Sequence, residues 1–140
     1  MLVDIAAYQS TGKVKIKDIS ERQDISQKYL EQIVTILSKC DLVRGERGPQ
    51  GGYVLTRPAS QITVAEVVTQ IEGGFSPAPC IKNGFVDCDR KDRCTTLDMW
   101  MKIERAVHQI MSETTIQDLL DDANRKGIIT ISDGMPEYVI

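Results

Sequence analysis

Hydrophobic residues recur every three or four positions in the N-terminal half of the chain, a spacing that predicts amphipathic helices. The first helix is already under way at Met1 without a capping residue, so we expect about a dozen residues to precede it. A second helix is expected over Ile16–Gln23, followed by a turn at Asp24. A third helix begins after Ser26 as N-cap and ends near Lys39. Its apolar residues share one face: Leu30, Ile33, Val34 and Leu37.

Two short β-prone segments follow the third helix. Leu-Val-Arg at 42–44 and Tyr-Val-Leu at 53–55 flank the glycine- and proline-rich loop GERGPQGG, which predicts a β-hairpin. Helix, turn, helix and hairpin in this order make a winged helix-turn-helix, an architecture that binds DNA. We therefore predict a mainly α fold with a small β-hairpin.

The C-terminal half returns to helical spacing. Thr63 is expected to cap a helix over 64–71 that glycines end, and further helices are expected over about 95–112 and 115–124. The long helix carries one apolar stripe: Leu97, Trp100, Met101, Val107, Ile110 and Met111. This stripe either packs on the chain's own core or forms a dimer seam. We favour a homodimer, because a two-fold protein reads a palindromic operator.

Charge supports this division of the chain. The net charge is −3, yet residues 10–50 hold eight Lys or Arg against six Asp or Glu, so the head is locally basic and suited to DNA. The expected segments are a winged helix-turn-helix DNA-binding domain (1–72), a cysteine-rich cluster-binding loop (73–94), a dimerisation arm (95–125) and a loosely ordered C-terminal tail (126–140). No apolar run approaches roughly 18 residues and no secretory leader is present, so we expect a cytoplasmic protein.

Polar side chains crowd the start of the third helix, where a recognition helix meets base edges: Gln27, Lys28, Tyr29, Glu31 and Gln32. The alternative is a solvated helix face. Arg47 at the tip of the hairpin favours DNA, because a cation on a glycine-rich wing can enter a narrow minor groove.

Three cysteines, Cys80, Cys88 and Cys94, lie in the stretch CIKNGFVDCDRKDRC. Thiolates bind iron–sulfur clusters and zinc, and in a reducing compartment such a group indicates ligands more than disulfides. We favour an iron–sulfur cluster, with zinc and a thiol switch as alternatives. The fourth cysteine, Cys40, is expected to be structural. No catalytic triad or phosphate loop is found, so we do not expect an enzyme.

The segments DISERQDISQKYLEQIVTILSKCDLV and RGPQGGYVL resemble the IscR, NsrR and CymR family of bacterial winged-helix regulators. The resemblance covers nearly the whole chain. It implies a homodimeric transcription factor with an iron–sulfur cluster, most simply 2Fe-2S, whose state selects promoters. By this resemblance the base-reading positions are Ser26, Tyr29, Glu31, Gln32 and Arg47, and the cluster ligands are Cys80, Cys88 and Cys94.

The chain departs from such regulators in three ways. Leu97 stands where a histidine often completes the ligand set, the cysteine spacing is unusual, and the front of the first helix is absent. The fourth ligand is therefore open, with Asp87, Asp89, Asp98 and His108 as candidates. Some family members dock cysteine synthase, and the C-terminal Ile140 suggests that the tail could do so. The alternatives are a cysteine-metabolism repressor controlled by a partner enzyme or thiol oxidation, and a zinc-binding interaction module.

Overall fold

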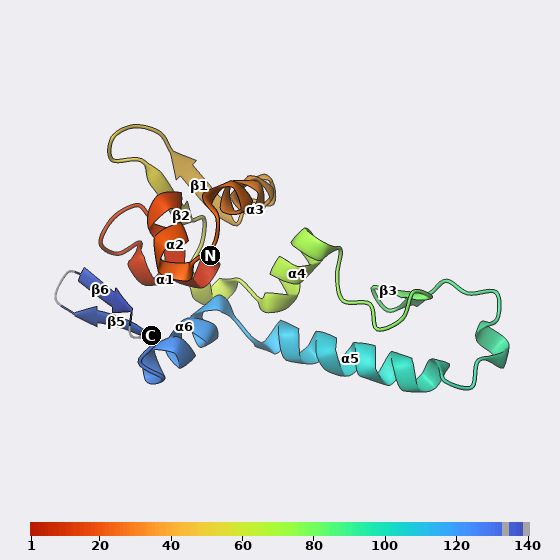
Figure 1. Cartoon of the computed structure of the whole chain (residues 1–140). Helices are drawn as coiled ribbons and strands as arrows, with labels where there is room; N and C mark the ends of the chain where they lie inside the picture. The colour runs from red at the N-terminus through yellow and green to blue at the C-terminus, as the bar shows by residue number, and fades with distance from the viewer. Residues whose placement is uncertain (133–134, 139–140) are drawn as a thin grey trace. The chain divides into compact units, whose positions relative to one another are not determined.

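A computed structural model describes residues 1–132 and 135–138 (Figure 1). The chain divides into two compact units, one of Met1–Ile62 with Thr115–Ile140 and one of Thr63–Thr114. These two units are defined by packing within the chain, whereas the predicted segments are defined by expected function. The boundaries of the predicted segments therefore stay predictions. Among the described helices, none has the length and apolar character needed to cross a membrane.

The first unit contains the predicted winged helix-turn-helix. Its elements are α1 (Leu2–Tyr8), α2 (Ile16–Gln23), α3 (Gln27–Lys39), β1 (Val43–Glu46), β2 (Gly52–Leu55), η1 (Ala59–Gln61), α6 (Ile116–Arg125), β5 (Ile129–Ser132) and β6 (Met135–Tyr138). The predicted mainly α fold with a β-hairpin is confirmed, and the limits of the second and third helices agree with the sequence pattern.

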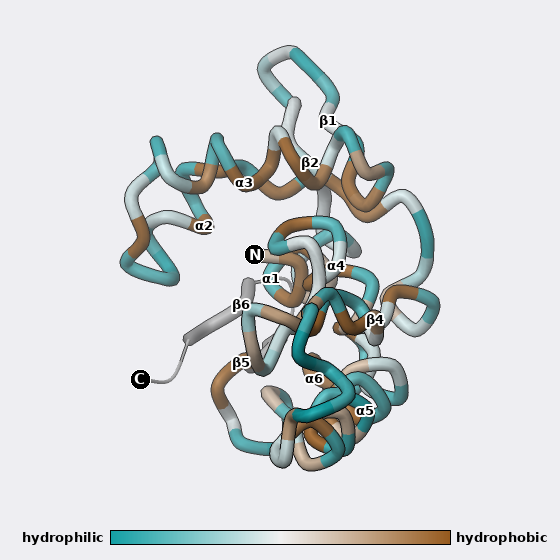
Figure 2. Tube along the Cα trace, turned by 90° about the vertical axis from the view of Figure 1, so that its right-hand side faces the viewer, coloured by the Kyte–Doolittle hydropathy of each residue, from teal (hydrophilic) through white to brown (hydrophobic). Residues whose placement is uncertain are grey.

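Local chemistry explains the turn between α2 and α3. Asp24 takes a left-handed conformation with φ of 52°, which ends α2. The Ser26 hydroxyl accepts a hydrogen bond from the Tyr29 amide at 3.2 Å and so caps α3. The apolar face of α3 then packs inward and its polar face outward, and hydrophobic and hydrophilic positions alternate along it in Figure 2.

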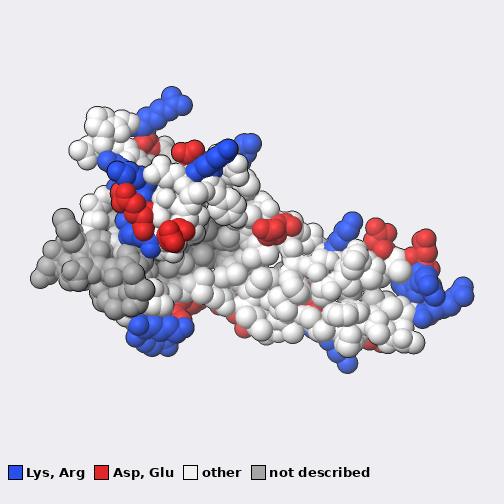
Figure 3. All heavy atoms as spheres, in the orientation of Figure 1, with Lys and Arg blue, Asp and Glu red and all other residues white. Residues whose placement is uncertain are grey.

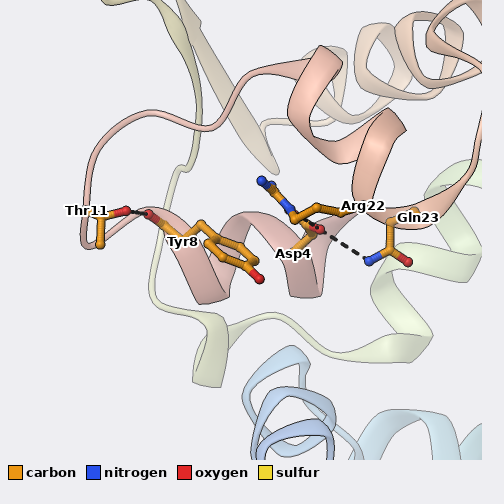
Figure 4. A network of polar contacts seen from close by, with 5 residues as sticks. All are labelled: Asp4, Tyr8, Thr11, Arg22 and Gln23. Carbon is orange, nitrogen blue, oxygen red and sulfur yellow. Dashed lines mark hydrogen bonds and ion pairs between the residues drawn. The ribbon is translucent and has the colours of Figure 1, made fainter. Parts of the chain in front are cut away.

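Aliphatic side chains from α1, α2, α3 and the neighbouring segments form the core of the winged helix-turn-helix. The fully buried ones are Ile5, Ile19, Leu30, Leu37, Leu42 and Ile62, and helix α1 also packs on α6. A polar network joins α1 to α2 beside this core (Figure 4). The Asp4 carboxylate accepts hydrogen bonds from Arg22 Nε and Gln23 Nε2, both at 3.2 Å. The Arg22 guanidinium lies 4.1 Å from the centre of the Tyr8 ring.

The end of the chain differs from the expectation of a loose tail. Helix α6 begins with a capping box in which Thr115 and Asp118 bond reciprocally, and the chain then forms the antiparallel pair β5–β6. The β-branched residues of Ile129–Ser132 favour a strand, and Ile129 is buried, which explains the difference. The predicted partner contact at Ile140 lies outside the described residues.

The second unit consists of α4 (Val64–Glu72), β3 (Ile81–Lys82), β4 (Phe85–Val86), η2 (Lys91–Arg93) and the long helix α5 (Leu97–Glu113). Thr63 caps α4 as predicted, by accepting a bond from the Glu66 amide. Gly73, in the left-handed region with φ of 76°, ends the helix. Helices α4 and α5 pack together, and the Val64 amide donates to the Thr114 carbonyl at 2.8 Å.

The predicted stripe on α5 is divided by this packing. Five of its members are half-buried: Leu97, Trp100, Met101, Val107 and Met111. Ile110 remains 65% exposed, and Met99 and Ile103 extend its surface along the helix. Packing within the chain therefore uses much of the stripe, and an apolar face of Met99, Ile103 and Ile110 stays open.

Candidate DNA interface and cysteine loop

The polar residues predicted to read DNA lie on the outer face of α3. The six residues Ser26, Gln27, Lys28, Tyr29, Glu31 and Gln32 are all exposed. Tyr29 keeps 56% of its surface accessible, although Leu30 beside it is buried. An exposed aromatic ring at this position is available for contact with a partner. The arrangement matches what a recognition helix requires at its N-terminal end.

The wing is an antiparallel pair in which Val43 faces Leu55 and Glu46 faces Gly52. Its tip holds Arg47, which is exposed. The loop turns sharply after it, since Gly48 has φ of 113° and a Cβ on Gly51 would collide with the Glu46 carbonyl.

A third segment, which the sequence pattern did not predict, pairs with the wing. Val14 pairs with Tyr53 through two backbone hydrogen bonds of 3.0 and 2.8 Å. The Lys13 ammonium forms an ion pair with Glu46, and Lys15 Nζ donates to the Pro49 carbonyl at 3.4 Å. A hydrogen bond from Lys13 is the main cause that lowers the pKa of the Glu46 carboxyl below its usual value.

Lys13 and Lys15 thus add two cations beside the wing. Figure 3 shows Lys and Arg side chains projecting over the β1–β2 hairpin and the neighbouring part of α3. A single β-branched residue between two lysines is a signal that could have indicated this extended segment.

The cysteine loop contains a short hairpin that the sequence pattern did not predict. Asn83 and Gly84 both have positive φ, at 49° and 79°, and connect β3 to β4 as a tight turn. The Asp87 amide donates to the Cys80 carbonyl at 2.8 Å. The hairpin therefore brings the backbone of Cys80 beside the residue that precedes Cys88, while Cys94 follows the single turn η2.

The three thiols differ in exposure. Cys80 and Cys88 are half-buried and Cys94 is exposed. The Cys94 sulfur lies 3.6 Å from the Thr96 hydroxyl. Hydrogen bonds from the Thr96 hydroxyl and amide, with a smaller contribution from Arg90, lower the pKa of the Cys94 thiol.

The donor chemistry of the loop suits a soft metal centre, since all three thiols are free. Their geometry does not yet form one: in the part of the chain that the structure describes, no three Cys, His, Asp or Glu side chains gather as metal ligands. The loop would have to close round a centre. Cys40, by contrast, is half-buried at the end of α3, apart from the loop in the sequence.

Comparison with known proteins places these features in a family. The Rrf2 family, described as iron-dependent transcriptional regulators, matches residues 1–122. The regulator IscR of Yersinia enterocolitica is 35% identical over 147 aligned positions, which cover 99% of this chain and 88% of that protein.

Two solved structures have the same fold. CymR of B. subtilis, described as a global cysteine regulator, superposes with a TM-score of 0.71 at 29% identity, covering 86% of this chain and 88% of CymR. IscR of T. potens gives a TM-score of 0.71 at 29% identity, covering 93% and 85%. A winged helix-turn-helix followed by a cysteine loop and a long helix, with relatives of this kind over nearly its full length, is thus the chain of a transcriptional regulator that belongs to the Rrf2 family.

Proposed function

We propose that this regulator binds a palindromic DNA operator as a homodimer in the cytoplasm and adjusts its binding to the state of an iron–sulfur cluster held by Cys80, Cys88 and Cys94. The observation that supports DNA binding most directly is the pairing of an exposed polar face on α3 with an exposed arginine at the tip of an adjoining wing.

Each element has a physical task in this proposal. Gln27, Glu31 and Gln32 carry the amide and carboxylate groups that pair with base edges in the major groove. Ser26 and Tyr29 also face the bases, as the resemblance to such regulators implies, and Lys28 suits a phosphate contact that fixes the register. Arg47 enters the minor groove, where the negative potential attracts a guanidinium.

A selection from random-sequence duplexes would identify the operator, and fluorescence anisotropy would measure affinity for it. Arg47→Ala should weaken binding by roughly tenfold and reduce the salt dependence. Arg125→Ala is the matched control, because it removes an exposed cation of α6 that has no place in the proposed interface. Equal effects of the two substitutions would exclude the wing contact.

The sensing half of the proposal rests on the donor set of the loop and on the family's description as iron-dependent. The three cysteines would hold the cluster, which supplies reversible chemistry with oxidants or nitric oxide when it is bound. Cluster binding would order the cysteine loop, which precedes α5 in the sequence. A coupling of about 1–3 kcal/mol between cluster and DNA binding is enough for regulation.

Anaerobic purification followed by an absorption spectrum and iron and sulfide analysis tests this half. Wild-type protein and Cys40→Ala should carry iron and sulfide, whereas Cys80→Ala, Cys88→Ala and Cys94→Ala should lose them. Colourless protein that contains zinc would favour the zinc-binding alternative instead. Equal affinity of cluster-loaded and apo-protein for every operator would rule out sensing by the cluster.

A second candidate is a regulator of cysteine metabolism that is controlled by a partner enzyme or by thiol oxidation. The likeness to CymR favours it as a runner-up. A chain that binds DNA without iron, and that releases DNA when cysteine synthase is added, would establish this candidate. Removal of Ile140 should then abolish the release.

A further inference from the structure

The second unit contains a cavity of about 490 Å³ that the DNA interface and the cysteine ligands do not use. It lies among α4, the β3–β4 turn and α5, whose arrangement can be followed in Figure 1. Its polar lining comes from Thr69, Asn83, Glu104, Arg105, His108 and Gln109. Cavities of this size suit small molecules.

Glu104 is the unusual member of this lining. It is only 6% exposed, and within the described residues its carboxylate has neither a hydrogen bond nor an ion pair. It stands on α5 one turn after Trp100 and one turn before His108. Because Glu104 lines the cavity, its carboxylate can accept hydrogen bonds there, which favours a ligand that supplies a donor.

The β3–β4 turn lies beside Glu104. A Cβ on Gly84 would lie 4.0 Å from both carboxylate oxygens, so the turn rests against the carboxylate. A Cβ on Gly74 would collide with the Asn83 side chain, and the two residues therefore pack closely. Gly74 and Asn83 thus line the cavity in close contact, which the missing side chain of glycine permits.

The remaining polar groups define the ligand further. Arg105 lines the same cavity, and its Nε alone donates within the described residues, to the Met101 carbonyl at 3.3 Å. The terminal nitrogens of its guanidinium are left to bind a carboxylate. His108, Gln109 and Asn83 add neutral hydrogen-bonding groups.

From this geometry we propose that the cavity is an effector site for a small zwitterion of the amino-acid class. Glu104 binds the ammonium group of the ligand, and Arg105 binds its carboxylate. Because the cavity lies against the β3–β4 hairpin, an occupied site would restrain the loop that bears the cysteines. The site does not depend on a metal centre, so it can exist in protein with or without a cluster.

Isothermal titration of the full-length apo-protein with each standard amino acid tests the proposal. At least one amino acid should bind, while its N-acetyl derivative, which lacks the ammonium group, should not. Glu104→Gln should weaken binding by roughly tenfold to a hundredfold, since a charge-assisted hydrogen bond is lost. The amide of the same amino acid should lose affinity in wild type but not in Arg105→Ala.

Glu113→Gln is the matched control on the same helix, because this exposed residue accepts a bond from Gln109 at 2.9 Å and a glutamine can still accept it. It should leave binding unchanged. Circular dichroism confirms that each variant folds. Failure of every amino acid to bind, or equal binding by wild type and Glu104→Gln, would overturn the proposal. So would binding of Zn²⁺ alone that depends on Glu104 and His108.

Discussion

At the residue scale, Asp4 is a charged side chain that is buried in the first unit. Its side chain is 1% exposed and it pairs with Arg22, which is 20% exposed, across α1 and α2 (Figure 4). The sequence pattern did not predict this pair, because an acid in the first turn of a helix is ordinarily at the surface. Only the crossing of two helices turns it inward.

The Asp4 pair leads to a stability prediction. Asp4→Ala leaves a partly buried guanidinium without its carboxylate, so the free energy of unfolding should fall by about 3 kcal/mol. Glu21→Ala removes a carboxylate from the exposed pair with Lys17 and should cost less than about 0.5 kcal/mol. Urea denaturation measures both, and a similar small loss for the two variants would contradict the buried role of Asp4.

Cys94 carries a prediction of reactivity. It is the exposed thiol, and hydrogen bonds from Thr96 lower its pKa below the ordinary value of 9.0. Its reactive thiolate therefore forms at lower pH than that of an unperturbed thiol. Iodoacetamide with mass spectrometry should show Cys94 of the apo-protein alkylated first, with a rate that rises at a lower pH than for thiols of the unfolded chain.

Thr96→Val should slow this reaction, because the valine side chain offers no hydroxyl to the thiolate. Faster labelling of the half-buried Cys80 or Cys88 would show that exposure and hydrogen bonding do not govern the loop as described.

At the element scale, the N-terminal end of α3 is capped by Ser26 and is also the end that is exposed for the proposed DNA contacts. Ser26 caps the helix in the structure and is also a predicted DNA contact. Ser26→Ala should lower stability by about 1 kcal/mol through loss of the cap. Ser26→Asp keeps a capping oxygen but adds a negative charge, so it should retain stability and weaken DNA binding by roughly tenfold.

Thr115→Ala provides the comparison for these two variants, since it removes the cap of α6 and should cost similar stability without loss of DNA affinity. Anisotropy and thermal unfolding would be measured on the same samples. Unchanged affinity in Ser26→Asp would remove Ser26 from the proposed interface.

At the scale of the whole molecule, the open face of α5 belongs to the proposed homodimer. Met99 and Ile103 lie one helical turn apart, Ile110 lies two turns further along the same face, and the three are 47%, 37% and 65% exposed. Ile110→Asp should therefore convert the dimer to a monomer in sedimentation velocity and reduce affinity for a palindromic operator. Lys102→Asp, on the same helix but in a polar position, should leave the dimer intact. A wild-type protein that sediments as a monomer would contradict this prediction.

The sequence by itself determined the order and limits of most elements. Asp24, Ser26, Thr63 and Gly73 begin or end helices through bonds between neighbouring residues, so their effect can be read from the local sequence. The grouping of three cysteines likewise predicts a ligand set, because thiolate chemistry needs no knowledge of the fold.

The tertiary structure alone decided which distant groups meet. Val14 pairs with Tyr53, Asp4 turns toward Arg22, and Glu104 lines a cavity together with Asn83 of the β3–β4 turn. In the sequence Glu104 stands beside Arg105, as charged residues of a solvent-exposed helix face often do, so its burial could not be predicted from the local pattern. Such contacts depend on how elements pack, and local periodicity carries no information about a partner many residues away.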